Sequence, residues 1–216
     1  YLNIQLFRYY PPYIYYILAF LSTLFQNPII LTNLFIIAIA WFGGVSWLLF
    51  HKWIGWFPAI FGGLLYLVLP DMVRISFSEG NLLRHFANAL LPITFFLVLT
   101  SLHHPDKKWQ RVILALVFTI LVLTHPMMAA IITAVSFLLV LLYTLFNKEH
   151  LKNSINIAIY IILGLMLSCF WLLPSLTGGI TELSNEAMIA GIPIVPLASL
   201  FSPSTRTNNI EGYYIG

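Results

Sequence analysis

Residues 71–85, DMVRISFSEGNLLRH, combine charged and apolar side chains in a chain that has few charges elsewhere. The planar guanidinium of arginine matches pairs of phosphate oxygens, and histidine can donate a hydrogen bond. A loop of this composition at a membrane surface can therefore hold the charged head group of a lipid. The side chains able to contact such a ligand are Asp71, Arg74, Glu79, Arg84 and His85.

An ordinary solvated loop is the alternative explanation of the same residues. Its charges would then lie in water, and Arg84 and His85 would only mark the start of the next helix. Gly80 fits either explanation, because glycine readily adopts the positive φ that a tight turn can require. The sequence leaves both explanations open.

A second candidate, His125, lies in LVLTHPMMAA between two apolar runs. Proline has no backbone N–H and disfavours helix at the residue before it, so Pro126 predicts a helical hairpin that turns at His125. A histidine in such a turn is either a satisfied interfacial side chain, or a hydrogen-bond donor or metal ligand that faces the outer side.

The composition identifies the chain as an integral membrane protein. Of its 216 residues, 60% are hydrophobic and 8% are charged, whereas soluble domains have about 25% charged residues. The net charge of +3 reflects basic residues in short loops, which topology explains, so we expect no nucleic-acid partner. The chain begins at Tyr1 rather than methionine, and we expect it to be part of a longer protein.

The apolar runs predict an all-α bundle of about six transmembrane helices within residues 1–174, embedded in the lipid bilayer of the cell membrane. A spanning helix needs roughly 20 residues. The shorter run 11–25 therefore predicts a juxtamembrane or re-entrant helix. The six predicted spans are 28–50, 54–70, 84–102, 110–125, 126–147 and 154–174.

The positions of lysine and arginine predict the orientation of these helices. Three loops on one side carry six basic residues, and such loops usually face the cytoplasm. The opposite side would hold residues 71–84, His125 and residues 175–216, which we expect to begin an extracytoplasmic loop or domain. The six basic residues are Lys52, Lys107, Lys108, Arg111, Lys148 and Lys152.

The sequence shows no motif of a soluble enzyme, such as a P-loop, a GxSxG serine motif or a HExxH zinc motif. No acidic or basic residue lies in the middle of a predicted span. Ion-coupled transporters usually keep such groups within the membrane, so a transporter or flippase is the less favoured class. Any chemistry is expected at the outer face.

Several short motifs occur in an order that resembles a known family. YYPPYIYYILAF at 9–20 resembles the entry of polytopic GT-C-type glycosyltransferases, and LVLPDMVRISFSEG at 67–80 resembles their next outer loop. LVLTHPMMAA at 121–130 has the histidine-bearing turn, and FWLLPSL at 170–176 the closing Leu-Pro. Together these motifs resemble the 6-pyruvoyl-tetrahydropterin synthase-related membrane proteins, although nothing in the chain looks like the soluble pterin enzyme.

The resemblance implies a GT-C-like helical bundle that works in cell-envelope glycan assembly. It implies transfer of a sugar from a polyprenyl-phosphate carrier at the outer face of the membrane. The catalytic acid of such enzymes typically lies in an outer loop that would precede Tyr1, so no catalytic residue is assigned here. Arg84 stands where related sequences often have an acid, which favours binding roles over base catalysis in this loop.

The resemblance also suggests what the candidate residues bind. Arg74, Arg84, His85 and His125 would contact the carrier phosphate.

A divalent cation, Mg or Mn, would bridge that phosphate to Asp71 and Glu79, the candidate metal ligands. The alternative is a noncatalytic membrane scaffold or lipid-binding subunit built on the same bundle.

Overall fold

The computed structural model describes residues 10–25, 27–78 and 80–177, and these residues form helices with no strand among them. The first group comprises α2 (Tyr13–Ser22), α3 (Pro28–Ser46), the 3₁₀-helix η1 (Trp47–Phe50), α4 (His51–Ile54), α5 (Trp56–Val68), α6 (Pro70–Val73) and the π-helix η2 (Arg74–Ser78). The second group comprises α7 (Leu82–Ala89), α8 (Leu91–His103), α9 (Lys108–Thr124), α10 (Pro126–Phe146), the 3₁₀-helix η3 (Lys148–His150), α11 (Leu151–Leu167) and α12 (Cys169–Leu176).

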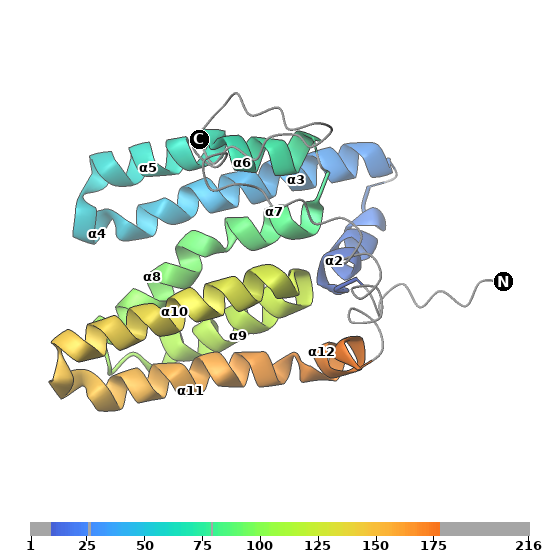
Figure 1. Cartoon of the computed structure of the whole chain (residues 1–216). Coiled ribbons are helices and arrows are strands. Elements are labelled where there is room, and N and C mark those ends of the chain that lie inside the picture. The colour runs from blue at the N-terminus through green and yellow to red at the C-terminus, as the bar shows by residue number, and fades with distance from the viewer. Residues whose placement is uncertain (1–9, 26, 79, 178–216) are drawn as a thin grey trace, which may run out of the picture.

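The helices pack as a bundle with α7 and α8 in its middle (Figure 1). α3 packs on α5 on one side, and α9 packs on α10 and α11 on the other. The buried apolar core lies mainly between α8, α9, α10 and α11, and its largest fully buried side chain is Phe118 of α9. The remaining outer faces of the helices are strongly apolar, as expected for surfaces that contact lipid.

Among the described residues, four helical segments are long and apolar enough to cross a membrane: Pro28–Ile54, Leu82–His103, Pro126–Phe146 and Lys148–Leu167. A fifth is possible if Trp56–Val68 and Pro70–Ser76, which meet at an angle of 44°, together make one bent span. The chain is therefore an all-α protein with several apolar helices, and the predicted number of about six spans is not confirmed.

The departures from six spans have local causes. Leu69 has extended backbone (φ −54°, ψ 129°) because it precedes Pro70, and this breaks the predicted span 54–70. α9 has only 17 residues, and its first turns bury Gln110 and Arg111. The predicted span 154–174 divides at Ser168, where α11 ends and α12 begins.

Other local predictions are confirmed. α9 and α10 form a hairpin that turns at His125, with Pro126 in the first turn of α10. Gly80 has a φ of +59° before α7. A short helix, α2, lies within 11–25.

The two ends of the bundle differ. One end holds α2, the start of α7, the α9–α10 turn and α12, and we call it the site end (Figure 1). The three connections α4–α5, α8–α9 and α10–α11, which lie among the predicted cytoplasmic basic residues, come together at the opposite end. The structure contains no membrane, so the assignment of the site end to the extracytoplasmic face stays a prediction. Residues 178–216 lie outside the described residues.

Close packing of α9 against α11 depends on a glycine. A Cβ on Gly164 would collide with the carbonyl oxygen of Ala115 and lie 2.8 Å from Cβ of Phe118. The same contact allows Thr119 Oγ1 to donate a hydrogen bond to the Gly164 carbonyl at 2.9 Å. Small residues commonly permit such close approach between membrane helices.

We predict that Gly164→Ala destabilises the bundle by about 1–3 kcal/mol, because the added methyl group must push α9 and α11 apart. The measurement is thermal unfolding of the purified protein in detergent. Leu163→Ala is the control, because Leu163 is the preceding residue and is exposed on the outside of α11. Equal stability of Gly164→Ala and the wild type would contradict the close packing.

Candidate functional site

Asp71 holds two arginines from different parts of the chain. Its Oδ1 accepts a hydrogen bond from Nη2 of Arg74 at 2.7 Å, and its Oδ2 accepts one from Nη2 of Arg84 at 3.3 Å. All three side chains are partly exposed, with 23% to 37% of their surface accessible. Two guanidinium groups and one carboxylate give this arginine cluster, defined as Asp71, Arg74 and Arg84, a formal charge of +1.

Local backbone structure places the arginines side by side. Arg74 begins the π-helix η2, a rare helix type that often occurs at functional sites. The positive φ of Gly80 then reverses the chain, and the side chain of Asn81 accepts a hydrogen bond from the backbone N–H of Arg84 at 3.0 Å. This N-cap starts α7 and brings Arg84 in its first turn back toward Asp71.

His85 lies inside the bundle. Its side chain is only 1% exposed. Its Nδ1 is 2.8 Å from Oγ of Ser76, and its Nε2 is 3.2 Å from the carbonyl oxygen of Ile36 in α3. Both ring nitrogens thus have partners within the protein. Direct contact of His85 with a phosphate stays a prediction, and this geometry favours an indirect role.

His125 caps α10 and lies close to the arginine cluster. Its Nδ1 accepts a hydrogen bond from the backbone N–H of Met128 at 3.2 Å. Burial, together with the nearby positive charge of Arg84, lowers the pKa of His125 from its ordinary value of 6.5. The turn between α9 and α10 and the start of α7 therefore meet at the site end.

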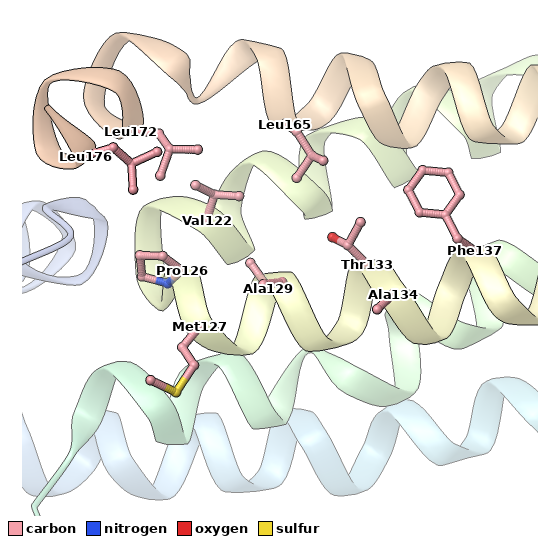
Figure 2. A pocket seen from close by; sticks show the side chains of 11 residues that line it. Val122, Pro126, Met127, Ala129, Thr133, Ala134, Phe137, Leu165, Leu172 and Leu176 are labelled. Atoms are coloured by element: carbon pink, nitrogen blue, oxygen red, sulfur yellow. The ribbon is translucent and has the colours of Figure 1, made fainter. Parts of the chain in front are cut away.

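An apolar groove of about 690 Å³ begins next to this turn (Figure 2). Pro126 and Met127 lie at its start, and Phe137 lies further along α10. The other wall includes Leu165 of α11, and Leu172 of α12. Eleven residues of helical rise separate Pro126 from Phe137, so the groove extends about 16 Å along α10. The side chains that line it are apolar except for Thr133.

Of the two predicted metal ligands, Asp71 lies in the described part of the chain. Both carboxylate oxygens of Asp71 accept hydrogen bonds from arginines, and Glu79 lies outside the described residues. Within the described ranges, no three or more histidine, cysteine, aspartate or glutamate side chains are grouped so that they could hold a metal ion. A divalent cation at Asp71 and Glu79 stays a prediction.

A family model for the 6-pyruvoyl-tetrahydropterin synthase related domain, described as a membrane protein, matches residues 7–216. The chain belongs to this family. Comparisons with curated proteins and with solved structures gave no match. Membership of the 6-pyruvoyl-tetrahydropterin synthase-related family agrees with the apolar helices and establishes a membrane protein.

Sequence reasoning missed two partners of His85 in this family member. Ser76 lies in the candidate loop, but a serine among apolar residues gives no signal of its own. The Ile36 carbonyl is a backbone group 49 residues away, and no sequence pattern identifies it. The groove was also missed, because its lining residues look like ordinary lipid-facing side chains.

We predict that protonation of His125 destabilises the protein. The fold lowers the pKa of His125, so its contribution to stability is complete above pH 6.5 and is lost as the pH falls below that value. His125→Asn keeps a side-chain acceptor for the α10 cap but does not titrate. The unfolding temperature in detergent should therefore fall less between about pH 7 and pH 5 for His125→Asn than for the wild type.

The control for this comparison is His104→Asn, because His104 is exposed at the end of α8, far from the site end. Its pH profile should follow that of the wild type. Parallel profiles for the wild type and His125→Asn would show that His125 does not contribute to the pH dependence of stability.

Proposed function

We propose that this chain binds a polyprenyl-phosphate-linked sugar at the outer face of the cell membrane, as part of a glycosyltransferase in cell-envelope glycan assembly. One observation supports this most directly. The arginine cluster and the apolar groove lie at the same end of the bundle, so one amphipathic molecule can contact both.

The arginine cluster suits the phosphate of such a carrier. Arg74 and Arg84 present two guanidinium groups around one carboxylate, and two oxygens of a phosphate can accept from such groups in the same way. The side chains of the cluster are partly exposed. Asp71 orients the arginines before a ligand arrives, which lowers the ordering cost of binding.

The groove suits the hydrocarbon chain of the carrier. It starts at Pro126, the residue after His125, whose pKa responds to the charge of Arg84. A prenyl chain in the groove would bury apolar surface, worth about 25 cal/mol per Å² where the groove is otherwise filled by water. In a bilayer the free-energy gain is smaller, because lipid rather than water fills the groove. The shape of the groove would then select between hydrocarbon chains.

The described residues support binding more than they support transfer. Both carboxylate oxygens of Asp71 accept hydrogen bonds from arginines, so Asp71 does not suit a general base. A noncatalytic lipid-binding subunit on the same bundle is therefore the second candidate. The arginines would stabilise a leaving phosphate in the first case and only retain the carrier in the second.

The first test measures binding of geranyl phosphate to the protein in detergent micelles. We predict that Arg84→Ala weakens binding by about 10- to 100-fold, because a hydrogen bond to a charged group contributes about 1.5–3 kcal/mol. Lys148→Ala is the matched control, since it removes an exposed positive charge from the opposite end of the bundle. Unchanged binding by a folded Arg84→Ala variant would contradict the phosphate site.

Two additions to this titration separate the candidate functions. Repeating it with EDTA tests the predicted divalent cation. Incubating the protein with a polyprenyl-phosphate-linked sugar and a glycan acceptor tests transfer. Sugar transfer that Arg84→Ala reduces supports the glycosyltransferase, whereas binding without transfer supports the lipid-binding subunit.

The second test concerns the groove. Ala134 lines it, and Ala134→Phe should fill part of its volume. We predict that this variant binds farnesyl phosphate about tenfold more weakly, since losing two buried CH₂ groups costs about 1.6 kcal/mol. Binding of isopentenyl phosphate, whose chain is too short to reach Ala134, should not change.

Val135→Phe is the control for Ala134→Phe. Val135 is the next residue of α10, is 42% exposed, and does not line the groove. Equal loss of farnesyl phosphate binding in both variants would show that the hydrocarbon chain lies elsewhere.

A further inference from the structure

Ser76 and His85 form a buried polar pair close in sequence to the residues of the arginine cluster. They line a cavity of about 220 Å³ between α3, α5, α6, η2 and α7, and its other lining side chains are apolar. Ser76 is 9% exposed and His85 is 1% exposed. Each is two residues or fewer from an arginine of the cluster: Ser76 follows Arg74 by two positions, and His85 follows Arg84 directly.

The hydrogen bonds of this pair need more protons than a neutral histidine supplies. His85 Nδ1 contacts Ser76 Oγ at 2.8 Å, His85 Nε2 contacts the Ile36 carbonyl at 3.2 Å, and Ser76 Oγ contacts the Met72 carbonyl at 2.6 Å. The two carbonyl oxygens only accept. A neutral imidazole has one N–H and serine has one O–H, so two protons are available for three contacts.

An imidazolium ring supplies the missing proton. With both ring nitrogens protonated, His85 donates to Ser76 and to Ile36, and the Ser76 hydroxyl is left to donate to Met72. All three contacts are then hydrogen bonds. They join α3 to the segment that contains Asp71 and Arg74 and to α7, which contains Arg84.

We propose that His85 is a positioning residue of the phosphate site, and that it takes up a proton when a phosphorylated lipid binds to Arg74 and Arg84. This inference rests on the proposed function. A buried imidazolium is costly in the free protein. A phosphate with up to two negative charges offsets that cost, since a nearby opposite charge favours the charged form. The completed hydrogen bonds then hold both arginines in place around the phosphate.

The other charged and titratable groups around His85 can be identified in the described residues. The α6–η2 segment contributes Asp71 and Arg74, and α7 contributes Arg84. α5 contributes Tyr66, whose hydroxyl donates to the Asn88 carbonyl, and the α9–α10 turn contributes His125. α3 contains no charged or titratable residue. Of these groups, His125 is the other histidine, so the experiment is done in the His125→Asn background.

The experiment counts the protons taken up when geranyl phosphate binds. Isothermal titration calorimetry of the protein in micelles, in two buffers of different ionisation enthalpy, gives this number at pH 7. His85→Gln is the comparison, because glutamine can donate to Ile36 and accept from Ser76 but cannot be protonated. Protons that geranyl phosphate itself takes up or releases are counted equally with both proteins. A difference in proton uptake between the two proteins is therefore due to His85.

The protein with His85 should take up close to one more proton per bound phosphate than the His85→Gln variant. As the pH falls from about 8 to 6, its affinity for geranyl phosphate should also rise more steeply than that of the His85→Gln variant. For one linked proton, the affinity gain approaches about tenfold for each pH unit. Ser76→Ala removes the bond that the extra proton completes, so it should reduce the proton uptake while His85 remains. If His85→Gln does not fold, the Ser76→Ala variant tests whether His85 takes up a proton on binding.

The outcomes separate this inference from the proposed function. Tight binding with equal proton counts and parallel pH profiles, in the protein with His85 and in the His85→Gln variant, would overturn the role of His85 and leave the phosphate site intact. No binding of geranyl phosphate by the protein with His85 at any pH would overturn the proposed function, and this inference with it.

Discussion

The constraint on which the whole structure depends is that backbone polar groups inside an apolar bundle must find hydrogen-bond partners within the protein. Lipid offers no hydrogen bonds, so the backbone of the described segments is helical and short connections separate the helices. Some buried side chains also have partners within the protein. Buried Arg111 donates to the Pro105 carbonyl, and Asn153 of α11 donates to the carbonyls of Ser101 and Leu102. These bonds tie α8, α9 and α11 together at the end opposite the site.

The arginine cluster is the accessible counterpart of these buried bonds. Asp71 neutralises part of the positive charge of Arg74 and Arg84, so the two guanidinium groups can lie near each other without a ligand. Because the two arginines come from segments on either side of Gly80, their separation depends on how η2 and α7 pack. His85 of α7 joins the two segments from within the bundle, because its ring contacts Ser76 of η2.

The site end brings together groups with different physical roles. The cluster provides charge, the groove provides apolar surface, and the α9–α10 turn connects them through His125. The ligand that we propose, a lipid with a phosphate head, would contact both surfaces at once. Membership of the 6-pyruvoyl-tetrahydropterin synthase-related family establishes the membrane setting and leaves the chemistry to these residues.

The sequence by itself determined the features that depend on local chemistry. Low charge and long apolar runs identified a helical membrane protein, Pro126 predicted the turn at His125, and Gly80 allowed the positive φ before α7. Each signal acts within a few residues of the backbone, where steric and hydrogen-bonding rules are strong. The candidate charges of 71–85 were also recognised, because charge is rare in this chain.

Only the tertiary structure decided which of these groups meet. It directed His85 toward Ile36 rather than toward the outside, bent the predicted span 54–70 at Leu69, and left the groove between α10, α11 and α12. These features depend on how closely helices approach, as at Gly164 and Ala115, which are 49 residues apart. Such contacts reflect the shapes of two surfaces together, and neither sequence segment records the shape of its partner.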